Sequence, residues 1–143
     1  MIVLDTNAVS EVMKPNPSEV VVDWLDAQTP DEVFITVVTQ AELLYGVESL
    51  PAGKRRAALS QQVERVFAED FPGRILHFDQ LSARMFSMVV RQREAIGRPI
   101  LPLDAMIAAI ARSRNATVAT RNTRDFEGCG VRLINPWTER KPV

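Results

Sequence analysis

The chain has very few of the side chains that build disulfides and thiolate or imidazole sites. Cys129 is its only cysteine and His77 its only histidine in 143 residues. A single thiol excludes an intramolecular disulfide and lacks the partners of a thiolate metal site. One histidine has no second imidazole to pair with, so we expect His77 to be structural. A reducing compartment fits this composition.

Long hydrophobic runs and a strong net charge are absent as well. No apolar run reaches the roughly 18 residues needed to span a bilayer, and Asp5 comes before a signal-type segment can form. We therefore expect a cytoplasmic protein without a membrane segment. The formal net charge of -1 argues against a generally basic surface, so contacts with nucleic acid would have to be local.

What is present is typical of one globular domain. The hydrophobic fraction of 46% and the charged fraction of 24% are close to globular averages, and neither value suggests disorder or a fibrous repeat. A length of 143 residues suits a core large enough to fold alone. Because no internal repeat or linker interrupts the chain, we expect residues 1–143 to form a single domain.

Short apolar segments alternate with helical patterns along the chain. The segments predict strands at 2–4, 33–35, 74–78, 117–119 and 131–134. The patterns predict helices at about 6–13, 17–28, 37–49, 54–69, 80–96 and 103–114. Asn16 is the predicted cap of the second helix, Thr36 of the third and Asp79 of the fifth. Uniformly apolar strands separated by helices indicate an α/β fold, with a parallel sheet of about five short strands covered on both faces.

Polar side chains follow two of these strands. Asp5 ends the first strand in the segment VLDTN, and Asn122 and Asp125 follow the strand 117–119. Open α/β sheets bind ligands at the carboxyl ends of their strands, where loops lead into helices. These side chains are therefore candidates for one site.

Two further acids lie in helices that are otherwise apolar. Glu42 is on or beside a stripe formed by Val38, Ala41 and Tyr45, which predicts that it faces the core side. Asp104 is in the first turn of the most apolar helix. An ionised acid facing the core costs several kcal/mol unless it is paired or bound to metal.

Each acid also has a purely structural interpretation. Asp5 can cap a helix, Asp104 can interact with a helix dipole, and Asp125 can lie in a solvated turn. Glu42 gains nothing from a dipole in mid-helix, and its alternative is a buried ion pair with an arginine. All four together would repel one another unless a cation neutralised them, and oxygen ligands suit Mg²⁺ or Mn²⁺.

Four segments carry a resemblance to a known family: VLDTNAVSE, TQAELLYGV, LPLDAMIAAIA and VATRNTRDF. In this order, over nearly the whole chain, they resemble the motif series of PIN-domain ribonucleases. The match is closest to the VapC/FitB-type toxins of type II toxin-antitoxin systems. The resemblance implies a PIN-like three-layer α/β/α sandwich with Mg²⁺ or Mn²⁺ as cofactor.

Carried over onto this sequence, the resemblance assigns metal binding and catalysis to Asp5, Glu42 and Asp104. The fourth position stays open between Asn122 and Asp125. We rank Asp125 first, because an amide can ligate a metal through its carbonyl oxygen but brings no charge.

Hydroxyl and basic side chains near these acids are further candidates. Thr6 and Thr120 can support the acids or a metal-bound water, or can simply be strand-end threonines. Arg121 and Arg124 flank the last motif and are candidates for contact with an RNA phosphate.

The resemblance also implies an activity and partners. The activity is metal-assisted hydrolysis of RNA phosphodiester bonds, with tRNA and rRNA among the candidate substrates. The partners are a VapB-like antitoxin, which inserts a helix toward the acids, and a second copy in a homodimer.

Two other classes of function fit part of the pattern. A receiver-like or phosphatase-like domain also gathers acids at strand ends, but it requires a functional lysine, and the chain has none between Lys54 and Lys141. A non-catalytic PIN-like RNA- or protein-binding module is the second alternative, and it would be expected to lose acids from the set.

Overall fold

The sheet at the centre of the molecule has five parallel strands, seen in a computed structural model that describes residues 1–139. The strands are β1 (Ile2–Leu4), β2 (Val33–Thr36), β3 (Ile75–Leu76), β4 (Thr117–Ala119) and β5 (Arg132–Ile134). Their order is β3-β2-β1-β4-β5, and β1 is central because Ile2 pairs with Val33 on one side and Thr117 on the other. The predicted parallel α/β sheet is confirmed.

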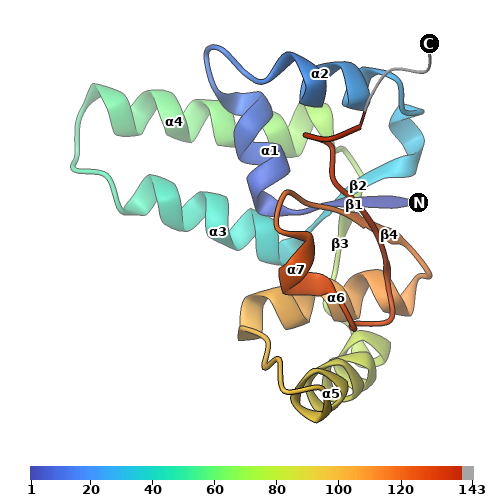
Figure 1. The fold of residues 1–143 in the computed structure, drawn as a ribbon. Coiled ribbons are helices and arrows are strands. Elements are labelled where there is room, and N and C mark those ends of the chain that lie inside the picture. Colours follow the sequence, from blue (N-terminus) through green and yellow to red (C-terminus); the bar gives the residue numbers. More distant parts are fainter. Residues whose placement is uncertain (140–143) are drawn as a thin grey trace.

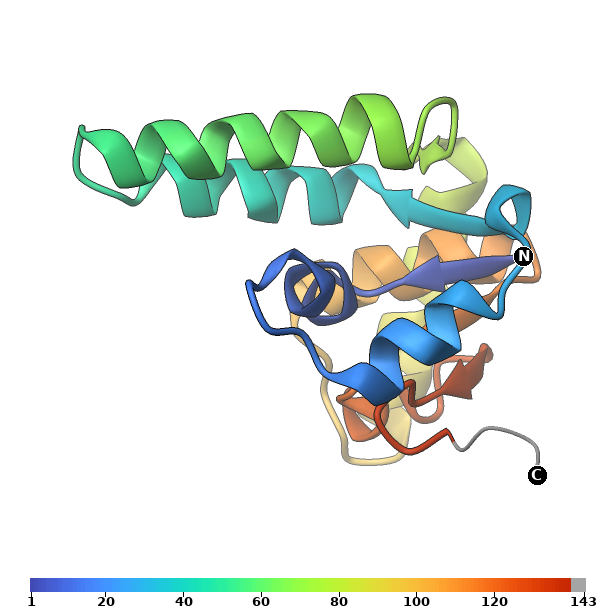
Figure 2. The ribbon, with the colours of Figure 1, turned by 90° about the horizontal axis from the view of Figure 1, so that it is seen from above.

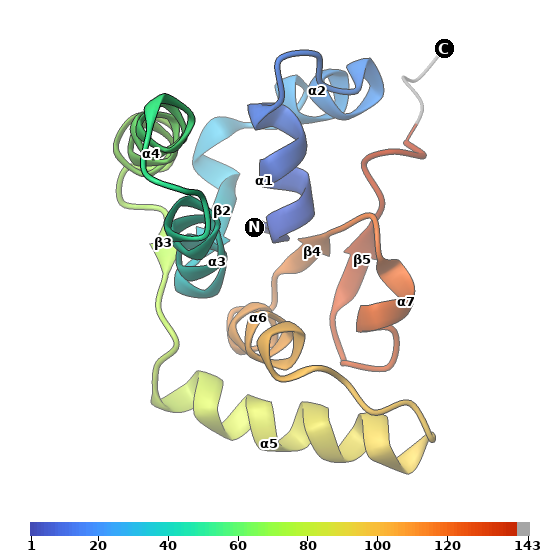
Figure 3. The same ribbon diagram turned by 90° about the vertical axis from the view of Figure 1, so that its left-hand side faces the viewer.

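Helices cover both faces of this sheet. They are α1 (Thr6–Met13), α2 (Glu19–Asp26), α3 (Val37–Glu48), α4 (Lys54–Arg65), α5 (Gln80–Ala95), α6 (Pro102–Ser113) and α7 (Thr123–Phe126) (Figure 1). Figure 3 shows α5 and α6 below the sheet and α1 and α2 above it. The α3–α4 pair forms a hairpin that extends beyond the sheet (Figure 2). Within residues 1–139, no helix is both long and apolar enough to cross a membrane.

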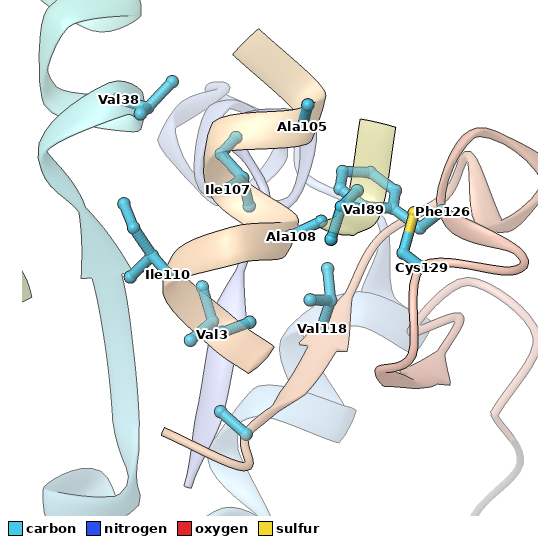
Figure 4. Close-up of a cluster of buried hydrophobic side chains, with 12 residues drawn as sticks. Val3, Val38, Val89, Ala105, Ile107, Ala108, Ile110, Val118, Phe126 and Cys129 are labelled. Carbon is cyan, nitrogen blue, oxygen red and sulfur yellow. The ribbon is translucent and has the colours of Figure 1, made fainter. Parts of the chain in front are cut away.

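The alternation of side chains along each strand produces two separate cores. Val3 of β1 and Val118 of β4 pack with α5 and α6 in one core, drawn in Figure 4. The next residues, Leu4 and Ala119, pack in the other core with α1, α3 and α4. Since successive strand residues point to opposite faces, uniformly apolar strands require this three-layer arrangement.

Helix α6 confirms the prediction from its composition. A helix that is apolar nearly all round needs neighbours on all sides, and α6 lies between the sheet and α5. Six of its residues are buried: Ala105, Ile107, Ala108, Ala109, Ile110 and Ala111.

Several predicted boundaries are wrong. Helix α2 begins at Glu19 rather than at Pro17, and Ser18 rather than Asn16 is its N-cap residue, because the Ser18 backbone (φ -57°, ψ 122°) is not yet helical. The β3 pairing covers only Ile75 and Leu76 of the predicted segment 74–78. The predicted helix 54–69 ends in a wider π-helical turn, Val66–Asp70, and the segment between β4 and β5 contains the unpredicted helix α7.

Candidate active site

Asp5 lies at the carboxyl end of the central strand and begins α1. Its carboxylate accepts the Thr6 backbone N–H at 2.8 Å, so it is the N-cap of the helix. The second carboxylate oxygen accepts the Thr120 hydroxyl at 2.8 Å, from the end of the neighbouring strand β4. Asp5 is only 6% exposed. The capping interpretation is confirmed, and it places the carboxylate where two adjacent strands end.

Glu42 projects from α3 toward the same place, although not for the reason the sequence suggested. The stripe of Val38, Ala41 and Tyr45 does not face the core as a unit, because Ala41 and Tyr45 are exposed while α3 buries Thr39, Leu43 and Val47 on another face. The Glu42 carboxylate accepts the Thr6 hydroxyl at 2.8 Å. This bond joins α3 to the start of α1.

Asp104 lies in the first turn of α6, and its surroundings disfavour its charged form. Burial, followed by repulsion from Asp5, Asp125 and Glu42, raises the pKa of Asp104 to about 6, and Arg93 offsets only part of this effect. Burial also raises the pKa of Asp5, against the hydrogen bonds from Thr120 and Thr6. The four carboxylates therefore lie within electrostatic range of one another.

Basic side chains in the described part of the chain form no ion pair with this cluster. Among residues 1–139, none of the four acids makes an ion pair, so the buried arginine partner considered for Glu42 is not found there. The hydrogen bonds from Thr6 and Thr120 orient two of the carboxylates without removing their charge. An acid cluster with unpaired charges favours the binding of a cation.

A cleft of about 430 Å³ opens over the acids. The side chains around it come from α1, α3, α6, the loop after β4 and the segment after β5. They are Asp5, Thr6, Asn7, Ser10, Glu11, Lys14, Glu42, Asp104, Arg121, Asn122 and Trp137. Three predicted acids and two candidate polar residues thus share one cleft, together with Arg121.

The other predicted residues lie near the cleft but do not line it. Asp125 is exposed on α7, within electrostatic range of Asp5 and Asp104. Thr120 is fully buried behind Asp5. The backbone carbonyl of Arg124 accepts a hydrogen bond from Arg98 at the surface. At the fourth position, Asn122 lines the cleft, whereas Asp125 contributes charge from its edge.

Sequence reasoning missed two residues that shape the site. Asn7 donates to the Thr120 hydroxyl at 3.4 Å and lines the cleft; its signal was its place directly after Asp5 and Thr6. Arg93 is a buried arginine on α5 that donates to the backbone carbonyls of Asp125 and Arg98. Nothing in the local sequence distinguished it from the exposed arginines around it.

The chemistry of the cluster suits a hard divalent cation. Apart from Lys14, Arg121 and Trp137, the side chains that line the cleft offer oxygen, and the like charges of the acids repel one another. No group of three acidic, histidine or cysteine side chains within residues 1–139 stands close enough to hold a metal as they are placed. The donor set fits the cation, and the carboxylates would have to draw together around it.

The sequence matches the family model of the PIN domain over residues 2–128. The chain belongs to the PIN domain family. Among PIN relatives, Toxin FitB of Neisseria gonorrhoeae is 39% identical over 137 residues, covering 96% of this chain and 99% of the relative. A tRNA(fMet)-specific endonuclease VapC of Shigella flexneri is 34% identical over 139 residues, covering 94% and 96%.

Solved PIN structures have the same fold. A crystal structure of FitAcB from Neisseria gonorrhoeae matches with a TM-score of 0.90 at 39% identity, covering 97% of this chain and 100% of that one. VapBC-5 of Mycobacterium tuberculosis, a member of the VapBC family of toxin-antitoxin systems, matches with a TM-score of 0.69 at 30% identity, covering 92% and 95%. The resemblance inferred from the four motifs is confirmed, and so is the PIN-like α/β/α fold.

Proposed function

We propose that this protein is the toxin of a type II toxin-antitoxin system and acts as a metal-dependent endoribonuclease. The observation that carries the proposal is the set of three carboxylates, Asp5, Glu42 and Asp104, which line one cleft and form no ion pair within residues 1–139. Membership of the PIN family and relatives named as a toxin and an RNA endonuclease support it.

The cofactor in this proposal is Mg²⁺ or Mn²⁺. Asp5, Glu42 and Asp104 would hold it, with Asp125 adding charge and Asn122 an amide oxygen. Such a cation, when bound, supplies a Lewis acid that activates water and stabilises the charge growing on the phosphate. The side chains of the protein would bind the cation, orient its ligands and balance the charge around it.

Two hydroxyls carry the orienting role. The Thr6 hydroxyl donates to one oxygen of Glu42, and the Thr120 hydroxyl donates to the Asp5 oxygen that does not accept the Thr6 N–H. Both carboxylates are thereby oriented, and each keeps lone pairs available. Arg121, at the rim of the cleft, offers a positive charge to an RNA phosphate, and Arg124 lies further out. This arrangement binds a polyanion beside an acidic site.

Substrate and partners follow from the relatives. The relative named for tRNA(fMet) supports tRNA as the substrate class, with rRNA as the alternative. The VapBC-5 structure supports a VapB-like antitoxin partner. In this proposal the whole chain, residues 1–143, is one PIN domain that acts in the cytoplasm.

A homodimer completes the proposal. Beside Glu42, apolar side chains of α3 and α6 line a groove, and Tyr45 within it is 75% exposed. An exposed apolar groove of this kind favours burial against another surface. The second copy implied by the resemblance is the occupant we propose.

The test is cleavage of an RNA pool by antitoxin-free protein with Mg²⁺ or Mn²⁺. We expect cleavage by the wild type and none by Glu42→Gln, with EDTA as the metal-free control. Glu48→Gln is the matched variant, because Glu48 lies on the same helix but pairs with Arg56 outside the cleft. A folded wild type that neither cleaves RNA nor binds Mn²⁺ would instead favour a non-catalytic PIN-like binding module.

A further inference from the structure

The cleft has a second end, which the acids do not occupy. Helix α1 runs along the cleft from Asp5 to Glu11, a span of about 9 Å at a rise of roughly 1.5 Å per residue. Lys14, Arg121 and Trp137 line the cleft with Glu11 beyond the acid cluster. A strand of RNA whose reacting phosphate lies at Asp5 would bring a neighbouring nucleotide to this end.

Trp137 forms a fixed wall there. Its backbone N–H donates to the Asn135 side chain at 3.0 Å, in a turn closed by the Thr138 N–H and the Asn135 carbonyl. The indole packs against the core that contains α1. Figure 3 shows the segment after β5 continuing alongside α1 toward α2. A turn and a core contact together leave the ring little freedom.

Glu11 and Lys14 complete this wall from the side of α1. Glu11 is 9% exposed, and its carboxylate pairs with Lys14 at 2.6 Å. Hydrogen bonding from Lys14 above all, with smaller contributions from the Ser18 backbone and the Trp137 side chain, lowers the pKa of Glu11. The charge of Lys14 is therefore balanced by Glu11. Arg121 is the basic side chain of this wall whose charge is not balanced in this way.

Arg121 lies over the Trp137 ring. Its guanidinium carbon is 5.4 Å from the centre of the Trp137 ring, within the range of a cation–π contact. Within residues 1–139, Arg121 makes no ion pair. Stacking engages the face of a guanidinium and leaves its N–H edge free for an anion. An arginine held in this way also loses less conformational entropy when it binds.

We propose that Trp137 is a positioning residue that holds the Arg121 guanidinium at the cleft. The guanidinium binds the RNA phosphate next to the phosphate at which the chain is cleaved. This inference rests on the proposed ribonuclease function. Beyond that function, it specifies that Trp137 holds Arg121 and that Arg121 contacts the neighbouring phosphate. Trp137 acts through Arg121, so its contribution depends on that side chain.

The test measures binding of a short fluorescein-labelled single-stranded RNA of mixed sequence to the full chain, in EDTA, over a series of salt concentrations. Arg121→Gln is expected to reduce the slope of log affinity against log salt by about 0.7, the value for one phosphate contact on a single strand. Arg91→Gln, an exposed arginine on α5 outside the cleft lining, is the matched control and should keep the wild-type slope.

The role of Trp137 is tested by a double-mutant cycle. Trp137→Leu keeps an apolar side chain against the core but removes the ring face, and we expect it to weaken RNA binding by about two- to five-fold. The same change in the Arg121→Gln background should have no further effect. Trp137→Phe keeps a ring face and should restore binding. In cleavage assays with Mg²⁺, Trp137→Leu should raise KM and leave kcat unchanged.

Each other result overturns the inference in a recognisable way. An unchanged salt slope for Arg121→Gln would exclude a phosphate contact. A Trp137→Leu effect that persists without Arg121 would mean that the ring contacts a base or only supports the fold. If Trp137→Leu fails to fold, Arg121→Lys replaces it, because an ammonium does not stack flat on the ring, and wild-type affinity for this variant would contradict the inference. A wild type that neither binds nor cleaves RNA would overturn the ribonuclease proposal itself.

Discussion

A single side chain at the end of β1 serves the fold and the candidate site together. Asp5 caps α1 through the Thr6 N–H and also accepts the Thr120 hydroxyl, while its pKa is raised by burial. Capping keeps one oxygen occupied and fixes the orientation of the carboxylate. The sequence offered helix capping and metal binding as alternatives for Asp5. The structure makes the two roles compatible.

Asp104 should make the metal-free protein less stable as the pH rises. The folded protein holds the pKa of Asp104 at about 6, above its ordinary value of 3.8, so the folded state binds this proton more tightly than the unfolded chain. The contribution of Asp104 to the free energy of unfolding is therefore largest below pH 3.8 and is lost as the pH rises through about 6. Asp104→Asn removes the cost of holding a charged carboxylate at this position, so the variant should be more stable than the wild type at neutral pH. We expect a gain of about 1–2 kcal/mol in the free energy of unfolding, a value reduced by the screening of the half-buried carboxylate by water.

Urea denaturation in EDTA over this pH range measures the effect. Asp31→Asn, at an exposed acid outside the cleft, is expected to keep the pH dependence of the wild type. An Asp104→Asn variant with the same pH dependence as the wild type would show that the carboxylate is not strained by its neighbours.

The hydroxyl behind Asp5 should affect metal binding although it does not line the cleft. Thr120→Val keeps the shape of the side chain but removes the donor to Asp5, a bond that favours the charged carboxylate. We expect the affinity for Mn²⁺, measured by isothermal titration, to fall about ten-fold. Thr117→Val, at the start of the same strand, is the control. Equal Mn²⁺ affinity in all three proteins would exclude an orienting role for Thr120.

At the scale of elements, most caps were easier to predict than the ends of strands, although Asn16 does not cap α2. Thr36 caps α3 and Asp79 caps α5 as expected, because a cap depends on one side chain and the N–H groups just after it. The extent of β3 depends instead on where a neighbouring strand offers partners, and that information is spread over the chain. The short helix α7 was missed because its stability also depends on a distant part of the chain, a contact from α5.

Arg93 makes that connection between α5 and α7. It is 4% exposed and donates to the carbonyls of Asp125 and Arg98. Arg93→Met would leave these carbonyls without their charged donor, and we expect it to lower the free energy of unfolding by about 2–3 kcal/mol. Arg91→Met, on the exposed side of the same helix, should change it by less than about 0.5 kcal/mol. Equal stabilities in urea denaturation would show that α7 does not depend on Arg93.

At the scale of the whole molecule, the sheet was predictable and the surroundings of the site were only partly so. Apolar strands such as 2–4 and 117–119 require cover on both faces, and the order of motifs indicated the PIN fold. The acids could be placed at one edge of the sheet because parallel strands end together. The wall formed by Trp137 could not, because it depends on how the segment after β5 folds back over α1.

The chemistry of the RNA ends is the most direct test of the central claim, that the acid cluster holds a metal which activates water for RNA cleavage. Hydrolysis by water should leave a 5′ phosphate and a 3′ hydroxyl at each cut made with Mg²⁺. We predict these ends for the wild type, and no cuts in EDTA or with Asp5→Asn. Cuts that persist in EDTA, or that leave a cyclic phosphate, would contradict the account.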